Sequence, residues 1–220
     1  MRMISFSQFL SMNSTTIITA TVQHLYLALG SELIGCLIAI PFGIWLTRRE
    51  KLADYVLAAT GSIQTIPSLA LLGFVLPLLG IGPLPAMVVL VLYSLLPVIR
   101  NTYTGIRNVN PVYIEAGTGV GMNSRQLLWM VKFPLALPII MAGVRISTVY
   151  LISWATLAAF IGAGGLGDLI ITGIQTADAN FIIAGTVPTA VLAIGAGWIL
   201  GKVEMFLTPR GSQLVPDEGR

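Results

Sequence analysis

The stretch YIEAGTGVGMNSRQLLWMVKFPLALP, Tyr113 to Pro138, interrupts an otherwise very apolar chain. Its charged residues and its alternating glycines are Glu115, Arg125, Lys132, Gly117, Gly119 and Gly121. A polar, glycine-rich insertion of this kind allows two interpretations. It could be a loop that binds a phosphate group, or a surface that docks another protein.

The composition of the whole chain limits its class. Of its 220 residues, 55% are hydrophobic and only 10% are charged. A soluble domain carries about 25% charged residues, so this chain has too few of them to cover a surface that faces water. We therefore predict an integral membrane protein.

The apolar segments predict the number of membrane spans. A spanning helix needs about 20 mostly apolar residues, and five segments approach or exceed this length. We expect an all-α fold with spans at about His24–Leu46, Val56–Leu79, Leu84–Thr104, Leu137–Phe160 and Phe181–Leu200. The glycine-rich stretch then lies between the third and fourth spans.

The distribution of Lys and Arg predicts the orientation. Cytoplasmic segments of membrane proteins carry an excess of these residues. Placing the N-terminus outside and the C-terminus inside leaves only Arg2 in the outer segments, and the inner segments then hold Arg48, Arg49, Lys51, Arg107, Arg125, Lys132, Lys202, Arg210 and Arg220. This bias explains the net charge of +3 without a nucleic-acid partner.

Two helix-start signals lie in the inner loop between spans three and four. Asn110 before a proline suits a capped helix start and predicts a short helix over about Pro111–Gly121. Asn123 begins a second segment, SRQLLWMVKF, whose pattern indicates an amphipathic helix in the membrane interface. We expect Pro134 to end this helix and Pro138 to open the fourth span.

The phosphate-binding interpretation fails on context. A nucleotide fingerprint follows a strand in a βαβ unit, and no strand or P-loop sequence occurs here. The second glycine run, GAGGLG (162–167), falls outside in the predicted topology. The single Cys36 and single His24 supply neither a disulfide nor a ligand pair, so we expect no cofactor and no metal site in this chain.

The inner loop resembles the EAA loop of binding-protein-dependent ABC transporter permeases. That pattern is E-A-A, three residues, G, nine residues, I, any residue, L-P. Glu115, Ala116 and Gly117 are followed at the same spacing by Gly121, and Val131, Phe133 and Pro134 complete the match. The departures are glycine for the second alanine, valine for isoleucine and phenylalanine for leucine.

The resemblance implies a role for each matched residue. In that family the loop forms coupling helices that insert into a cleft on an ATPase subunit. Glu115 would be the polar anchor, Ala116 and Gly117 the close-packing face, and Gly121 the turn between two short helices; Pro134 ends the matched motif. The chain would not itself be an enzyme, since ATP and magnesium would bind to the partner.

The resemblance also implies an organisation and a set of partners. The permease domain would cover 19–202, with the coupling loop at about 110–134, an N-terminal segment at 1–18 and a cytoplasmic tail at 203–220. Expected partners are ATPase subunits, a separate substrate-binding protein, a second permease subunit, identical or not, and membrane lipid. The expected location is the bacterial inner membrane.

Three other runs resemble the osmoprotectant permeases, which carry glycine betaine, carnitine and choline. They are SIQTIPSLALLGFVLPLLGIG (62–82), YTGIRNVNP (103–111) and TLAAFIGAGGLGDLIITGI (156–174). Methionine permeases also carry GAGGLG, so another small solute remains an alternative. A secondary transporter is a further alternative, although the chain shows no internal repeat.

Glu32 is the one acidic residue deep within a predicted span. An ionised carboxylate there costs several kcal/mol, so we expect it to face the interior of the helix bundle. It could lie on the path of a cationic headgroup, or it could hydrogen-bond another helix and fix the packing.

Overall fold

The computed structural model describes residues 5–208 and is helical throughout, with no strand in that range. Four long helices form the bundle: α1 (Phe6–Leu46), α4 (Pro83–Arg107), α7 (Phe133–Trp154) and α9 (Ala179–Leu207). The shorter helices are α2 (Glu50–Thr65), α3 (Ser68–Leu79), α5 (Pro111–Gly119), α6 (Ser124–Leu127) and α8 (Leu166–Thr176). A π-helical turn (Leu128–Lys132) precedes α7, and a 3₁₀ turn (Leu157–Ile161) follows it.

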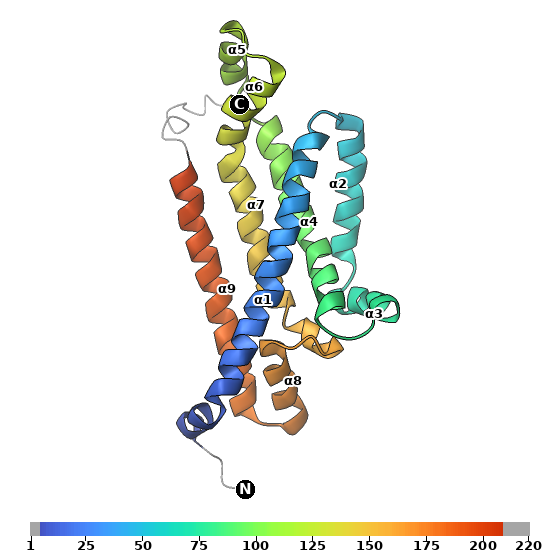
Figure 1. Cartoon of the computed structure of the whole chain (residues 1–220), viewed down its shortest axis with the longest axis vertical. Coiled ribbons are helices and arrows are strands. Elements are labelled where there is room, and N and C mark those ends of the chain that lie inside the picture. The colour runs from blue at the N-terminus through green and yellow to red at the C-terminus, as the bar shows by residue number, and fades with distance from the viewer. Residues whose placement is uncertain (1–4, 209–220) are drawn as a thin grey trace.

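The all-α membrane fold is confirmed. Four helices are long and apolar enough to cross a membrane, and α2 with α3 supplies a fifth span if the bent pair is counted as one. The described chain begins at one end of the bundle and finishes at the other (Figure 1). Which of these ends faces the cytoplasm stays a prediction from the Lys and Arg distribution.

The predicted second span is not one straight helix. A bend of 96° separates α2 from α3, and it falls at Ile66, which adopts an extended backbone before Pro67. Proline disfavours the helical conformation of the preceding residue, so the break is local in origin. The hydroxyl of Tyr93 donates a hydrogen bond to the carbonyl of Ile66 at 2.7 Å and satisfies the group that the break exposes.

The first helix is longer than expected. The sequence predicts a segment 1–18 separate from the first span, yet from Phe6 onward the chain is continuous with α1. The side chain of Ser5 accepts a hydrogen bond from the Gln8 N–H and caps this helix. Phe9, 4% exposed, packs edge-on against Phe181 of α9. A tertiary contact thus supports helix where the sequence is only weakly apolar.

Glycines bring α1, α4 and α7 close together. A Cβ added at Gly35 of α1 would lie 1.8 Å from the Ser94 Oγ of α4. One added at Gly143 of α7 would lie 2.6 Å from the Asn101 Cβ and 2.9 Å from the Pro97 carbonyl oxygen of α4. Helices in membranes associate through such small residues because the lipid supplies no hydrophobic drive. Helix α4 is therefore the centre of the bundle.

The GAGGLG run builds a turn that the sequence did not predict in detail. Gly162, Gly164 and Gly165 have φ of +69°, +83° and +88°, a region that side chains disfavour. The turn leads into α8, where a Cβ at Gly167 would lie 2.1 Å from the Thr156 carbonyl oxygen. These glycines serve backbone geometry and close packing.

The glycine contacts of α7 give a test of the packing. We expect Gly143→Ala to lower the free energy of unfolding by about 1–3 kcal/mol, since α4 presents backbone at that point. The measurement is thermal or denaturant unfolding of the purified chain in detergent.

Gly195→Ala is the matched control on α9, because nothing lies within 4 Å of the added methyl group. It should cause no loss of stability. Equal effects of the two substitutions would contradict the proposed role of Gly143 in packing.

Candidate functional site

Helices α5 and α6 project from one end of the bundle, and we call residues 110–132 the α5–α6 projection (Figure 1). Both predicted start signals are caps. The Asn110 side chain accepts from the Val112 N–H at 3.0 Å. Asn123 accepts from the N–H of Gln126, whose side chain accepts in return from the N–H of Asn123. This reciprocal capping box fixes where α6 begins.

Two glycines shape the projection in different ways. Gly121 has φ of +85° and occupies the turn between α5 and α6. Gly117 is buried, and a Cβ there would lie 2.7 Å from Leu127 Cδ1 and 3.3 Å from the Met122 sulfur. Gly117 therefore packs against the projection's own residues, whereas the resemblance implied that it forms, with Ala116, a close-packing face for a partner.

Glu115 and Ala116 lie on the exposed side of α5. Within residues 5–208, Glu115 takes part in no ion pair. The neighbouring Val120, which is 77% exposed, adds apolar surface at the tip. The projection thus offers a carboxylate beside small and apolar groups, a combination suited to docking in a protein cleft.

Pro134 does not end a separate interfacial helix, and that prediction is wrong. The chain runs from α6 through the π-helical turn into α7 as one span of 31 residues, Ser124–Trp154. The N–H of Phe133 donates to the Leu128 carbonyl, five residues back. A proline clashes with the carbonyl four residues before it, and the wider π turn relieves this clash. Pro138 likewise lies inside α7 and does not open the span.

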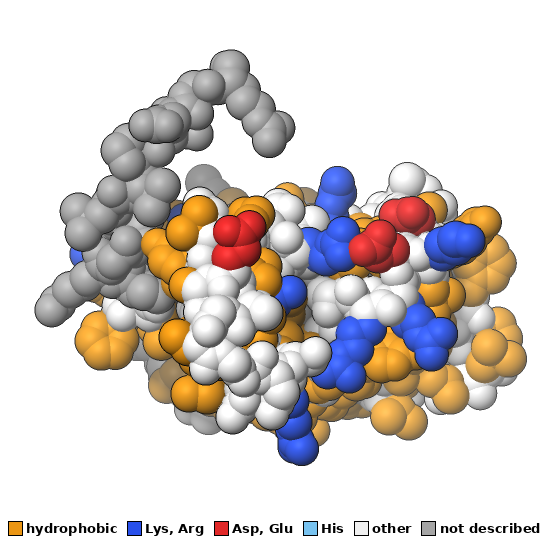
Figure 2. Space-filling model, turned by 90° about the horizontal axis from the view of Figure 1, so that it is seen from above, with side chains coloured by type: hydrophobic (Ala, Val, Ile, Leu, Met, Phe, Trp, Pro, Cys, Tyr) orange, Lys and Arg blue, Asp and Glu red, His pale blue; other side chains and the backbone are white. Residues whose placement is uncertain are grey.

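Basic residues lie beside the projection at this end of the molecule. Figure 2 views this end of the molecule and shows Lys and Arg side chains spread across it. Two cations at or near this end are paired: Arg107 of α4 with Glu50 of α2, and Arg145 of α7 with Glu204 of α9 at 3.3 Å. Arg2, Arg210 and Arg220 lie outside the described residues.

A small cleft lies where the projection joins the bundle. It has a volume of about 170 Å³, and Asn108, Asn110 and Tyr113 face Leu135 and Ile139 across it. Side-chain amides and a phenol here adjoin the start of α7. The cleft is too small for a folded partner but is wide enough for a side chain of one.

Glu32 lies inside the bundle, 5% exposed. The Ser147 hydroxyl of α7 donates to Glu32 Oε2 at 2.6 Å, and the Cys36 thiol donates to Oε1 at 3.3 Å. The carboxylate thus links α1 to α7 through a short hydrogen bond. Sequence reasoning singled out Glu32 but missed Ser147, because a serine within an apolar span carries no signal of its partner.

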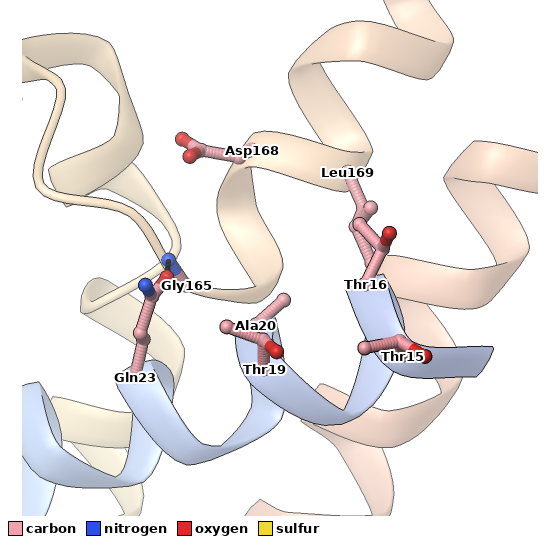
Figure 3. A pocket seen from close by; sticks show the side chains of 8 residues that line it. All are labelled: Thr15, Thr16, Thr19, Ala20, Gln23, Gly165, Asp168 and Leu169. Atoms are coloured by element: carbon pink, nitrogen blue, oxygen red, sulfur yellow. Dashed lines mark hydrogen bonds between the residues drawn. The ribbon is translucent and has the colours of Figure 1, made fainter. Parts of the chain in front are cut away.

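A second pocket lies at the opposite end, between α1 and the start of α8 (Figure 3). It has a volume of about 300 Å³, and it is lined by Thr15, Thr16, Thr19, Ala20, Gln23, Gly165, Asp168 and Leu169. The Gly165 N–H donates to Gln23 Oε1 at 3.2 Å. Partial burial raises the pKa of the Asp168 carboxyl. This pocket joins hydroxyls, an amide and one carboxylate.

The surroundings of His24 indicate a role in packing. It is fully buried, and its Nε2 lies 2.8 Å from the Ile152 carbonyl oxygen of α7. Across residues 5–208, no three His, Cys, Asp or Glu side chains are grouped so that they could hold a metal ion.

Residues 39–206 match the family model described as "Binding-protein-dependent transport system inner membrane component". Two similar relatives come from Bacillus subtilis. The choline transport system permease protein OpuBB is 48% identical over 94% of this chain and 95% of its own length. The glycine betaine/carnitine/choline transport system permease protein OpuCB is 48% identical over 93% and 94%.

A solved structure shares the fold. The inward-facing MetNI methionine ABC transporter has a chain that superposes with a TM-score of 0.78 at 22% identity. The match covers 88% of this chain and 97% of that one. The two chains therefore share their overall fold.

The hydrogen bond between Glu32 and Ser147 can be tested by a double-mutant cycle. Ser147→Ala should lower the free energy of unfolding by about 0.6 kcal/mol, the mean for hydrogen bonds between membrane helices, and by no more than about 1.7 kcal/mol. In a Glu32→Leu background the same change should cost much less. Unfolding of the purified chain in detergent provides the measurement.

Ser153→Ala on the same helix is the control, because that hydroxyl bonds only the Val149 carbonyl of its own helix. Its effect should not depend on Glu32. Additive effects of the Glu32 and Ser147 substitutions would contradict the coupling.

Proposed function

This chain belongs to the family of binding-protein-dependent transport system inner membrane components, and from that premise we propose that it is the permease subunit of an ATP-driven importer of osmoprotectants. Membership makes it an ABC importer permease, a multi-pass membrane protein that acts in transport. The proposed substrates are quaternary amines such as glycine betaine, carnitine or choline.

The similarity to osmoprotectant permeases is the observation that carries the choice of substrate. At 48% identity over nearly the full length of both chains, the OpuBB and OpuCB relatives share much more sequence with this chain than the methionine transporter of the same fold does. Methionine transport therefore has only the shared fold and the GAGGLG run in its favour. A secondary transporter is not favoured, because the family works with binding proteins.

We assign the coupling role to the α5–α6 projection. Glu115 and Ala116 are exposed on α5, and Gly121 allows the reversal that returns the chain toward α7. A partner ATPase that grips this projection would act directly on a membrane helix, since α6 runs into α7 without a loop. Gly117 packs inside the projection, and Pro134 lies just after it in the first turn of α7.

Three kinds of partner would complete the transporter. ATPase subunits supply ATP and magnesium chemistry. A separate binding protein captures the substrate, in keeping with the binding-protein-dependent transport of the family. A second permease subunit completes the pathway. The expected location is the bacterial inner membrane, with the projection in the cytoplasm and the α1–α8 pocket outside.

Uptake measurements test the substrate. The chain, assembled with its cognate ATPase and binding protein in vesicles, should take up labelled glycine betaine, carnitine or choline when ATP is enclosed, and should not take up methionine. Uptake of methionine instead would overturn the substrate assignment. Uptake that needs an ion gradient but no ATPase would overturn the assignment as an ABC importer subunit.

Substitutions in the projection test coupling. Glu115→Lys and Gly121→Val should each reduce ATP-driven uptake by about tenfold or more, because losing a central interface contact costs at least 1–2 kcal/mol. The amount of chain in the membrane should stay unchanged. Co-purification of the ATPase measures the loss of docking.

Asp54→Lys is the matched control. Asp54 is an exposed carboxylate on α2, at the same end of the bundle but outside the projection. It should leave uptake and ATPase binding within twofold of the parent. Normal uptake by Glu115→Lys and Gly121→Val would show that the coupling assignment is wrong.

A further inference from the structure

A pocket of about 590 Å³ lies at the turn between α1 and α2, lined by Trp45, Arg49, Glu50, Lys51 and Leu52. It takes no part in the proposed coupling surface. Its lining combines two cations with an aromatic ring at the end of a membrane-spanning helix. The question is what occupies it.

The charges of the pocket are positive and available. Glu50, its one acidic residue, is already paired with Arg107 of α4. Arg49 and Lys51 are exposed, and neither forms an ion pair anywhere in the described range 5–208. Asp54 does not line the pocket. The two cations therefore present a net positive field to an anion.

The pocket is held in shape from both sides. On α1, the ring of Trp45 stacks on Phe42 with centroids 5.6 Å apart. On α2, the Arg49 carbonyl accepts from the N–H groups of Leu52 and Ala53, at 3.0 and 2.9 Å. Ala53 is fully buried and fixes the first turn of α2 against the bundle. A ligand would meet side chains on a rigid backbone.

The position of the pocket at the end of a membrane span indicates that its ligand is a lipid. Tryptophan at the end of a span lies at the level of the headgroups, and Lys and Arg beside it reach lipid phosphates. Below the cations, exposed apolar side chains continue along both helices: Ile38 and Trp45 on α1, Leu52 and Tyr55 on α2. A ligand with an anionic headgroup and acyl chains matches this surface, because cations lie at its end and apolar side chains lie below them.

We propose that the pocket formed by Trp45, Arg49 and Lys51 binds the phosphate headgroup of an anionic phospholipid, with the acyl chains against Leu52 and Tyr55. A soluble phosphate would use the cations but not the apolar flank. A protein partner that bound the cations would leave the apolar side chains of Leu52 and Tyr55 uncovered by the ligand and facing lipid. The inference rests on the membrane-spanning fold and not on the transported substrate.

Native mass spectrometry of the full purified chain, titrated with phosphatidylglycerol or phosphatidylcholine in mixed micelles, tests the proposal. Phosphatidylglycerol should bind at least tenfold more tightly. The double variant Arg49→Gln, Lys51→Gln should raise the dissociation constant for phosphatidylglycerol by about 25-fold, about fivefold for each cation lost. Its unfolding temperature without lipid should match that of the parent, which separates lost binding from lost folding.

The matched control removes two cations outside the pocket, Arg125 and Lys202, by the same substitution to glutamine. It should change the dissociation constant by less than twofold. Millimolar glycerol 3-phosphate should not displace the bound lipid. Equal binding of the two lipids, displacement by the soluble phosphate, or unchanged binding by the double variant would each overturn the proposal.

Discussion

The absence of water between lipid chains is the constraint on which this structure depends. Every backbone group in the spans must be satisfied by the protein itself, and apolar side chains gain nothing by leaving lipid for one another. The bundle therefore relies on the close approach of backbones at Gly35, Gly143 and the other glycines of α1, α4 and α7. The same constraint explains why the break at Ile66 is acceptable, since Tyr93 supplies a donor to its carbonyl.

Polar side chains inside the bundle must likewise find their hydrogen-bond partners within the protein, and burying an unpaired carboxylate would cost more free energy than burying an unpaired backbone group. Glu32 is acceptable because Ser147 and Cys36 each donate to one of its oxygens. This arrangement makes the carboxylate a contact between two spans, which is one of the two roles that its position allowed. A path for a cationic substrate past Glu32 would have to compete with the serine.

Much of the fold could be predicted from the sequence, for identifiable reasons. Long apolar runs set the spans, and asparagine caps set the starts of α5 and α6. Apart from the early start of α1 at Phe6, the errors came from prolines and glycines, whose effect depends on neighbours. Pro67 breaks a helix, whereas a π turn lets Pro134 continue one. Helix α8 was missed because its preceding glycine turn needs three left-handed residues and a close approach to Thr156, which no periodicity reveals.

At the candidate site, spacing located Glu115 and Gly121, but only the tertiary structure could show that Gly117 packs against Leu127.

The continuity of α6 with α7 has a mechanical consequence. At 1.5 Å per residue, the 31 residues from Ser124 to Trp154 form an arm about 46 Å long. A tilt of roughly 10° about one end of such an arm displaces the other end by about 8 Å. Gly143 contacts α4 and Ser147 contacts Glu32 of α1 in the half of this arm nearer Trp154. A movement imposed on the Ser124 end of this arm is therefore carried into the bundle by continuous helix, without an intervening loop.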